Sequence, residues 1–431
     1  MKTVKLLTAS TLLALAAQST QVNAAALADI YQQALLNDPQ LKAAHATYLA
    51  GAEATPLARA ALLPQLNLSA NTTWYDTETV DFNNNGYTLS LSQPLFDASS
   101  WFSFKRGESL SEQARLQFEQ AQQDLIIRTV KSYLDVLRAQ STVETNQAQE
   151  RAIKRRLDQV NARFEVGMGA ITNVQEAQAA YDNARVARIE AEGSMDNSYE
   201  ALERLTGKAA GKVDLLGEDY PVLGPIPAQA QPWLEKARAG NLSLRSADAT
   251  LLASRQAAKA ARADHLPTVS LNATYDYDKG TASSSEGTDA TYIGLTLSLP
   301  VFSGGLISSQ SRQAAQQMTA AQENREDALR AVTQSTRSLL RNLQTDVQSV
   351  SARKQSIKSS ETALKATEEG FNEGTRNVVD VLDAEQKLYA AQLNYANARF
   401  NYVLNLFNFK QQLGTLSPDD LNGLDQWLTK P

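Results

Sequence analysis

Cysteine is absent from the 431-residue sequence, and histidine occurs only twice, at His45 and His265. The absence of cysteine excludes disulfide bridges and thiolate metal sites, and it is compatible with an oxidising compartment without proving one. The H-E-x-x-H, phosphate-loop and G-x-S-x-G motifs are also missing. The stretch from Gly167 to Thr172 lacks the third glycine of a dinucleotide-binding loop and follows a helical pattern. We therefore expect no enzyme activity, no catalytic residues, no cofactor and no metal site.

Long apolar segments are missing too. No run of about 18 apolar residues follows the N-terminal segment, so the sequence predicts no transmembrane helix. The N-terminal segment has a basic start at Lys2 and Lys5, a short apolar core and a small-residue cleavage site ending at Ala24. This pattern is typical of a secretory signal peptide over residues 1–24, and the shortness of the core disfavours the alternative of a retained anchor. A membrane role would then require a β-barrel, the other structure that spans a bilayer.

Basic residues are fewer than acidic residues. The sequence has 41 lysines and arginines against 47 aspartates and glutamates, for a net charge of −6. Removal of the signal peptide takes away Lys2 and Lys5 and makes the chain more acidic still. Binding to phosphate backbones requires a basic surface, so we expect no nucleic-acid partner.

What the sequence does contain is an internal repeat. Three segments of the first half recur in the second half at a spacing of about 205 residues, far too long for a solenoid. The pairs are LLPQLNLSANTTWYD (62–76) with HLPTVSLNATYDYD (265–278), YTLSLSQPLFDASS (87–100) with YIGLTLSLPVFSGG (292–305), and RFEVGMGAITNVQEAQAAYD (163–182) with GFNEGTRNVVDVLDAEQKLY (370–389). We predict two copies of one structural unit, 25–220 and 233–431, joined by a Pro/Gly-rich linker at 221–232.

Each unit starts with two segments that alternate between apolar and polar residues. This period of two predicts strands over about 65–76, 87–94, 268–278 and 291–299. The polar stretches 81–86 and 279–289 are predicted to be hairpin loops. A half-buried sheet of a soluble protein gives the same alternation. The strand length of about ten residues, the small uncharged polar face and the aromatic residues near the loop ends favour strands that cross a membrane.

Each unit continues with two long helical segments, about 97–166 and 173–206, then about 304–372 and 377–413. Between Asp97 and Val166 there is no proline and only one glycine, Gly107. Large residues recur every seven positions in the shorter helices and alternate with alanine, as Val381 and Leu388 do with Ala384. Such lengths and periods indicate close-packed, coiled-coil-like helices. An ordinary antiparallel hairpin core would show the same composition.

Four strands per chain are too few to close a membrane barrel, which needs about eight or more. An open sheet edge in lipid leaves backbone groups unsatisfied at a cost of several kcal/mol each. If the strands cross a membrane, several chains must therefore share one barrel. The long helices would then continue its wall as a tube.

Several motifs of the chain carry a family resemblance that runs from the first helix to the C-terminal LGTLSPDDLNGL. They include LLPQL, SQPLFD, VGMGAITNVQEAQAAYD, LSLPVFSGG and GTRNVVDVLDA, in order and in both halves. In these motifs the chain resembles the TolC family of trimeric outer-membrane channels for multidrug efflux and type I protein secretion. The resemblance implies a twelve-stranded barrel built by three chains in the cell outer membrane and a helical barrel in the periplasm. It also implies a periplasmic adaptor and an inner-membrane pump, of the RND or ABC type, as partners.

The resemblance also implies roles for individual residues. Asp380 and Asp383 match the aspartates of the family's periplasmic constriction, where six carboxylates would attract cations. A pair of acids three residues apart on a helix is otherwise a solvated helix face. Five residues of the tip loops match the docking positions for the adaptor: Val166, Gly167, Met168, Gly374 and Thr375. Simple helix capping would also explain the glycines.

Four further positions match the links that hold the family's closed state: Thr172, Asn173, Phe371 and Arg376. Here the chain departs from the family pattern, which has a tyrosine at position 371 and an aspartate at position 173. A phenylalanine has no hydroxyl to donate, and the bond from Arg376 to an asparagine would lose its charge-assisted character. Either another contact closes the gate or it opens more easily, and easier opening is the expectation.

One alternative to a channel is a periplasmic coiled-coil adaptor. Such adaptors have one helical hairpin and a β-sandwich, whereas this chain repeats a strand pair with long helices. The sequence does not name the exported substrates, and a passive duct would take its specificity and energy from its partners.

Overall fold

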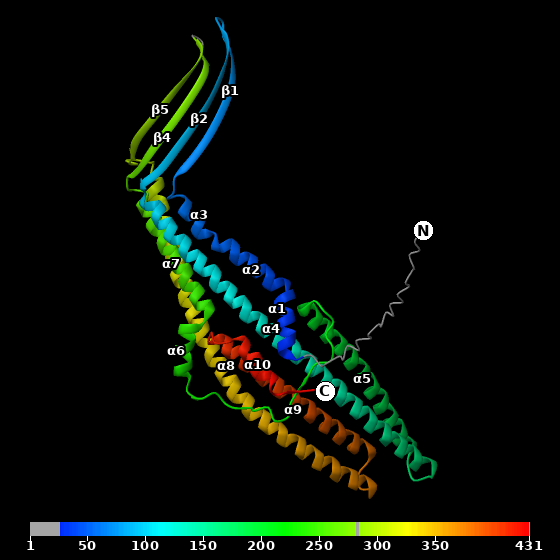
Figure 1. The fold of residues 1–431 in the computed structure, drawn as a ribbon. Helices are drawn as coiled ribbons and strands as arrows, with labels where there is room; N and C mark the ends of the chain where they lie inside the picture. Colours follow the sequence, from blue (N-terminus) through cyan, green and yellow to red (C-terminus); the bar gives the residue numbers. More distant parts are fainter. Residues whose placement is uncertain (1–25, 282–283, 431) are drawn as a thin grey trace, which may run out of the picture.

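The computed structural model describes residues 26–281 and 284–430 of the chain. The predicted signal peptide lies outside these residues. Figure 1 shows a long shaft of helices with a curved four-stranded sheet at one end and two helical hairpin tips at the other. None of the helices in the described ranges combines the length and the apolar character that a membrane span requires.

The two halves of the chain share one order, in which short helices lead to a strand pair and then to a long helical hairpin. The first half contains α1 (Leu27–Asn37), α2 (Pro39–Ala52), α3 (Ala54–Ala60), β1 (Gln65–Asp76), β2 (Asp81–Phe96), α4 (Ala98–Glu165), α5 (Ile171–Thr206) and β3 (Leu215–Leu216). The second half contains α6 (Ala230–Gly240), α7 (Leu242–Ala263), β4 (Thr268–Thr281), β5 (Ser284–Ser298), α8 (Leu306–Asn372), α9 (Val378–Gln412), α10 (Pro418–Asp425) and β6 (Leu428–Thr429). This repeat confirms the predicted fold class of long helices and four strands.

The sheet has the antiparallel order β1-β2-β4-β5. Its register places Leu66, Leu91, Ala273 and Ile293 in one row across the four strands. No helix covers the sheet in Figure 1, and Leu66 and Ile293 are 65% and 75% exposed. Within the described residues, β1 pairs only with β2 and β5 only with β4, so the sheet has two open edges.

The predicted hairpin loops at 81–86 and 279–289 are wrong. β2 already begins at Asp81, and the pairing of β4 with β5 continues to Thr281 and Ser284. Polar side chains support this extension, since Asn84 accepts a hydrogen bond from the Asn71 amide at 3.3 Å and donates one to the Gly280 carbonyl at 3.1 Å. Polarity at these positions reflects contact with water, whereas the backbone ladder continues regardless of side-chain polarity.

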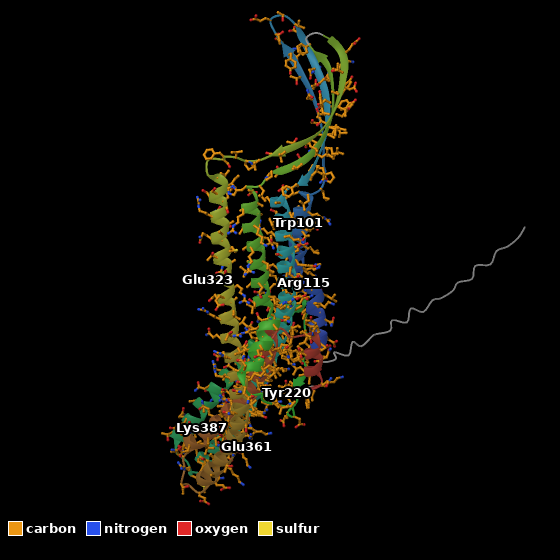
Figure 2. The ribbon with its side chains drawn as sticks, turned by 90° about the vertical axis from the view of Figure 1, so that its left-hand side faces the viewer. Trp101, Arg115, Tyr220, Glu323, Glu361 and Lys387 are labelled. Carbon is orange, nitrogen blue, oxygen red and sulfur yellow. The ribbon has the colours of Figure 1, made fainter. Side chains whose placement is uncertain are left out.

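The two long helices form the full length of the shaft. The 68 residues of α4 extend for about 100 Å at 1.5 Å per residue. α4 begins where the Asp97 carboxylate accepts the backbone N–H of Ser100 at 3.0 Å, a helix N-cap. Gly107 is buried against α3, where an added Cβ would lie 2.6 Å from the Ala54 carbonyl oxygen. In Figure 2, Trp101 marks the junction of the helices with the strands, and the Lys105 ammonium lies 5.2 Å from its ring.

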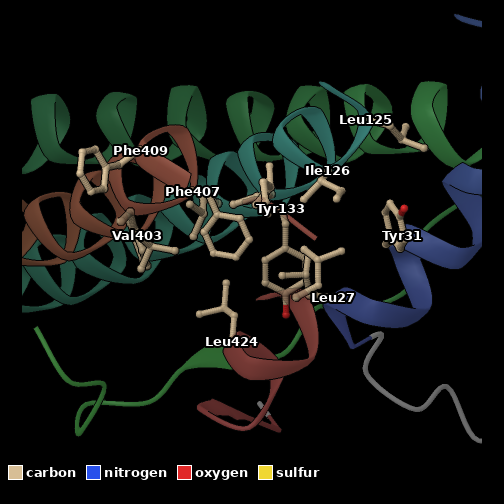
Figure 3. Packing of buried hydrophobic residues seen from close by; sticks show 14 of the residues in the cluster. Leu27, Tyr31, Leu125, Ile126, Tyr133, Val403, Phe407, Phe409 and Leu424 are labelled. Atoms are coloured by element: carbon tan, nitrogen blue, oxygen red, sulfur yellow. The ribbon is translucent and has the colours of Figure 1, made fainter. Parts of the chain in front are cut away.

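The helices are arranged side by side in a slab. Next to the sheet the order of contacts is α2, α4, α7 and α8, and towards the tips it is α5, α4, α9 and α8. The largest apolar core lies at mid-length, where α1, α4, α9 and α10 meet (Figure 3). Tyr133 is fully buried there, and its hydroxyl donates to the Asp214 carbonyl at 2.6 Å. Asp425 accepts the backbone N–H groups of Leu27 and Ala28 at 2.9 Å, so α10 caps the first helix of the chain.

Candidate functional site: the hairpin tips

The α4–α5 and α8–α9 hairpins end in the same kind of turn. Gly167 has φ +76° and Gly374 has φ +80°, the left-handed conformation that terminates many helices. The N–H of Gly167 donates to the Phe164 carbonyl at 2.9 Å, and the N–H of Gly374 donates to the Phe371 carbonyl at 3.2 Å. The two tips are therefore repeated copies of one glycine-terminated turn.

The predicted docking residues lie on the outside of these tips. Val166 and Met168 are 68% and 81% exposed. A Cβ added to Gly167 or Gly374 would meet nothing within 4 Å. Thr375 is exposed, and its hydroxyl donates to the Gly370 carbonyl at 3.0 Å. The tips thus present an accessible surface with little side-chain bulk at its two glycines.

The two aspartates have different surroundings. Asp380 belongs to a capping box at the start of α9: its carboxylate accepts the N–H of Asn377 at 3.2 Å, while its own N–H donates to the Asn377 side chain at 2.8 Å. Asp383 is exposed one turn further along α9. It lines a groove of about 760 Å³ between α4, α5 and α9, together with Glu176 and Gln386. Asp380 therefore has a structural use within its own helix, and Asp383 is the freer carboxylate.

The four predicted gate-link positions are not brought together within one chain. In the ranges 26–281 and 284–430, no hydrogen bond or ion pair joins Thr172 or Asn173 to Phe371 or Arg376. Arg376 is exposed, and its guanidinium lies 4.0 Å from Asp380. Phe371 is buried and belongs to a small apolar cluster that joins the two hairpins.

Phe371 takes part in a contact that needs no hydroxyl. The guanidinium of Arg163, on α4, lies 4.6 Å from the centre of the Phe371 ring, within the range of a cation–π interaction. A nitrogen of the same guanidinium donates to the Asn372 side chain at 3.1 Å. The Arg156 guanidinium lies 5.7 Å from the centre of the same ring. The two hairpins of one chain are thus joined through the Phe371 side chain.

The structure contains a buried ion cluster beside Phe371 that the sequence did not predict. Arg156 on α4 contacts Glu368 on α8 at 2.5 Å and Glu385 on α9 at 3.2 Å. Arg156 and Glu385 are buried, whereas Glu368 is partly exposed. One guanidinium therefore connects both helices of the α8–α9 hairpin to α4.

Not every polar atom of this cluster has a hydrogen-bond partner within the described residues. Among the residues that the structure describes, the buried Oε2 atom of Glu385 and the buried Nε atom of Arg156 have no hydrogen-bond partner. Burial raises the pKa of Glu385 above its ordinary value near 4.5, although the charge and hydrogen bond of Arg156 act in the opposite direction. Glu385 is thus the carboxylate of this cluster whose charge is most costly to bury.

We expect Glu385→Gln to change the pH dependence of stability. Because the folded protein holds a proton that the unfolded chain releases, the Glu385 contribution to stability falls as pH rises from about 4.5 through the raised pKa. The amide cannot titrate, so this slope should be absent from the variant. Thermal unfolding of the detergent-solubilised protein across this pH range measures the slope. The exposed Glu361→Gln serves as control, and equal pH slopes in the two variants would contradict the assignment.

A signal for the cluster was present in the sequence. Glu385 lies one heptad after Val378, which is fully buried, and Arg156 lies between the buried Ile153 and Val160. A charged residue on each of two apolar stripes indicates a pairing of opposite charges across a helix interface. The partner could not be identified without the relative height of α4 and α9.

The repeat of a strand pair and long helices matches a known protein family. The model of the outer membrane efflux protein family matches residues 30–208 and 233–415, one match for each half. The chain belongs to the outer membrane efflux protein family. Membership in this family of channels sets aside the alternative of a periplasmic adaptor.

Among curated relatives, outer membrane protein TolC of Vibrio cholerae is 38% identical to this chain, over 95% of each chain. TolC of Escherichia coli K12 is 36% identical, over 97% of this chain and 88% of the relative. The alkaline protease secretion protein AprF of Pseudomonas aeruginosa is 32% identical, over 92% of this chain and 85% of the relative. The resemblance to the TolC family is thereby confirmed.

Solved structures support the same fold. A crystal structure of CusC, from work on folding and transmembrane channel formation, superposes with a TM-score of 0.81 at 18% identity. The match covers 90% of this chain and 92% of that one.

Proposed function

We propose that three copies of this chain form an outer-membrane exit duct that opens and closes at its hairpin tips. The chain is an outer-membrane channel protein for efflux and type I secretion, with its helices in the periplasm. In the proposed assembly the three sheets join into one twelve-stranded barrel, and the three shafts enclose a tube.

The observation that carries the proposal is the uncovered sheet at the end of the shaft. Its edge strands expose apolar side chains, among them Leu68 at 71% and Leu295 at 69%, and none of the described helices packs over them. Both outer strands also leave backbone groups unpaired. Lipid covers an apolar face of this kind, and pairing of β5 with β1 of another copy removes the open edges.

The tips are proposed to meet a periplasmic adaptor, which links the duct to an inner-membrane pump of the RND or ABC type. Val166, Gly167, Met168, Gly374 and Thr375 form the accessible docking surface. The absence of side chains at the two glycines allows the backbone of a partner to approach closely. The chain itself supplies a passive path.

Gating is proposed to occur where the two hairpins of each chain meet. Thr172, Asn173 and Arg376 lie at the start of α5 and at the α8–α9 tip, where neighbouring copies would contact one another. Within each chain, the contacts of Arg163 with Phe371 and of Arg156 with two glutamates support the closed packing. The sequence left two alternatives open: another contact closes the gate, or the gate opens more easily. These contacts favour the first alternative.

Single-channel conductance in planar bilayers tests the proposal. We expect the wild-type protein to show a small, cation-selective conductance, and Asp380→Ala/Asp383→Ala to lower the cation-to-anion permeability ratio roughly tenfold because the carboxylate ring is gone. Asp383→Asn alone should produce most of this loss, because Asp383 is the freer of the two carboxylates. This single variant also leaves the Asp380 cap of α9 intact.

Glu323→Gln, on an exposed part of α8 far from the tips, is the matched control and should leave selectivity unchanged. Unchanged selectivity in the aspartate variants would mean that Asp380 and Asp383 do not form a selective ring and lie only on a solvated helix face. A folded, assembled wild type that never conducts would overturn the duct itself.

A further inference from the structure

Basic residues gather where the helices meet the sheet. Within about three turns of the sheet, α3, α4, α7 and α8 contain seven lysines and arginines but only one acidic residue, Glu108. The chain as a whole has more acidic than basic residues, 47 against 41, so this level reverses the overall charge. These seven residues form what we call the basic collar: Arg59, Lys105, Arg106, Arg255, Lys259, Arg262 and Arg312.

Most of the collar has no charged partner within its own chain. Lys105 pairs with Glu108 at 3.0 Å. In the part of the chain that the structure describes, the other six members have no ion pair, and all six are exposed. The acids of the adjoining turns do not neutralise them, because Asp97 caps α4 and Asp264 is partly buried. The collar therefore presents positive charge to its surroundings.

An apolar belt lies between the collar and the sheet. Leu95 and Phe96 at the end of β2 are exposed, and Phe302, in the connection to α8, is 88% exposed. Trp101, one turn into α4, is also exposed and marks this level in Figure 2. From the sheet towards the tips, the order is thus apolar strands, exposed aromatic residues and positive charge. Membrane proteins show this order where the hydrocarbon core meets the headgroups.

Side chains of the collar reach back towards this belt. Side chains of an α-helix lean towards its N-terminus, and both α4 and α8 begin at the sheet. The Lys105 ammonium accordingly lies 5.2 Å from the centre of the Trp101 ring, one turn nearer the sheet. On α7, the Lys259 ammonium lies 5.7 Å from the centre of the Phe102 ring. Such lysines keep their methylene groups on apolar surface while the charge stays at the level of the headgroups.

The far end of the sheet has the opposite charge. The segments 76–81 and 276–289, which contain the two hairpin turns, have seven acidic residues and a single lysine, Lys279. Of the two ends of the sheet, the one next to the shaft therefore attracts anions. The shaft lies in the periplasm, so these anions belong to the leaflet that faces the periplasm.

We propose that the basic collar binds the phosphate groups of anionic phospholipids in the periplasmic leaflet of the outer membrane. The inference rests on the proposed barrel and adds the class of lipid that surrounds one end of it. Five of the seven collar residues are arginines, whose guanidinium groups donate paired hydrogen bonds to phosphate oxygens. The apolar belt contacts the acyl chains of the same lipids. Together the two surfaces fix the height of the sheet in the bilayer.

Lipid retention tests this site in the full-length protein. The wild type is purified in detergent with equal amounts of phosphatidylglycerol and phosphatidylcholine that have the same acyl chains, and native mass spectrometry at low ionic strength counts the retained lipids. We expect phosphatidylglycerol to be enriched roughly tenfold, because each basic side chain near a headgroup favours the anionic lipid. In Arg59→Gln/Arg106→Gln/Arg262→Gln/Arg312→Gln the enrichment should disappear. Lysine at the same four positions keeps the charge and should keep most of the enrichment.

Arg151→Gln/Arg185→Gln/Arg353→Gln/Lys387→Gln is the matched control. It removes the same charge from exposed positions in the half of the shaft nearer the tips, where Figure 2 labels Lys387. This control should retain phosphatidylglycerol like the wild type, and circular dichroism verifies the helix content of every variant.

Equal retention of the two lipids by the wild type, or unchanged enrichment in the glutamine variant of the collar, would overturn the lipid site while leaving the duct intact. Displacement of phosphatidylglycerol by inorganic phosphate, beyond the effect of chloride at the same ionic strength, would assign the collar to free anions and also overturn the proposal. The same spectra report the number of chains. A wild type that stays monomeric would overturn the proposed function instead.

Discussion

Replacement of Arg156 by leucine is expected to destabilise the tip region by about 3–5 kcal/mol, because it leaves the buried Glu385 carboxylate without its counter-charge. Glu385 is only 5% exposed and contacts the guanidinium at 3.2 Å. Glu368 also loses its partner, but it is partly exposed and water solvates its charge. The buried carboxylate therefore accounts for most of the expected loss.

The double variant Arg156→Leu/Glu385→Leu identifies the cause. It removes both charges and places apolar side chains beside Ile153 and Val160, so most of the lost stability should return. Thermal unfolding followed by circular dichroism measures the single and double variants, which form a double-mutant cycle. A control is Lys154→Leu, which removes an exposed ion pair with Asp158 and should cost less than about 1 kcal/mol. Failure of the double variant to recover would mean that Arg156 acts through packing and not through charge.

The single variant Arg156→Leu also links stability to gating. Arg156 connects α4 to both helices of the α8–α9 hairpin, so its loss loosens the contact between the two hairpins of one chain. A larger mean conductance of Arg156→Leu than of the wild type is therefore expected. The arginine cluster lies within the same tip region as the predicted gate-link positions Phe371 and Arg376.

Much of the fold could be predicted from local pattern. The absence of proline between Asp97 and Val166 and the period of seven predict long helices, since backbone propensity and apolar stripes agree over many turns. Alternation in 65–76 predicts β1 for the same reason. The predicted start of β2 was wrong. Asn83 and Asn84 have the composition of a turn, yet they continue the pairing of β2 with β1 beside Asn71 and Thr72. Turn composition predicts exposure, and an exposed hairpin can still be paired.

The candidate site was only partly predictable. The glycines of the tips and the aspartates of α9 were found because their motifs are local. The second role of Asp380, in the Asn377 capping box, also has a local signal, since an Asn followed three residues later by an acid begins α9. The Arg156–Glu385 pair joins residues that are 229 positions apart, and it depends on the axial register of two helices. No pattern within one helix determines that register.

The contact between Gly240 and Gly414 is a second feature that only the three-dimensional structure shows. The end of α6 crosses the end of α9 there with backbone against backbone. Asn241 donates a side-chain hydrogen bond to the Gln412 carbonyl at 3.0 Å, and Gln412 donates to the Val332 carbonyl at 3.2 Å. This crossing fastens α6 and α8 to the core around Phe409.

Gly414→Ala should therefore lower the free energy of unfolding by about 3 kcal/mol or more. Gly414 has φ +70°, and a left-handed alanine costs about 1–2 kcal/mol by itself. An added Cβ would also overlap the Gly240 carbonyl oxygen, so the two helix ends must separate and the hydrogen bonds of Asn241 and Gln412 are strained. Thermal unfolding followed by circular dichroism measures the loss.

Gly374→Ala separates the two contributions. Its φ of +80° carries the same left-handed cost, but an added Cβ there meets nothing within 4 Å. The loss in Gly414→Ala beyond that in Gly374→Ala is thus the free energy of the close crossing. Gly193→Ala, in the middle of α5 with open space around it, should instead stabilise by up to about 1 kcal/mol. Equal losses at 414 and 374 would mean that α6 yields freely and that the crossing does not hold the core together.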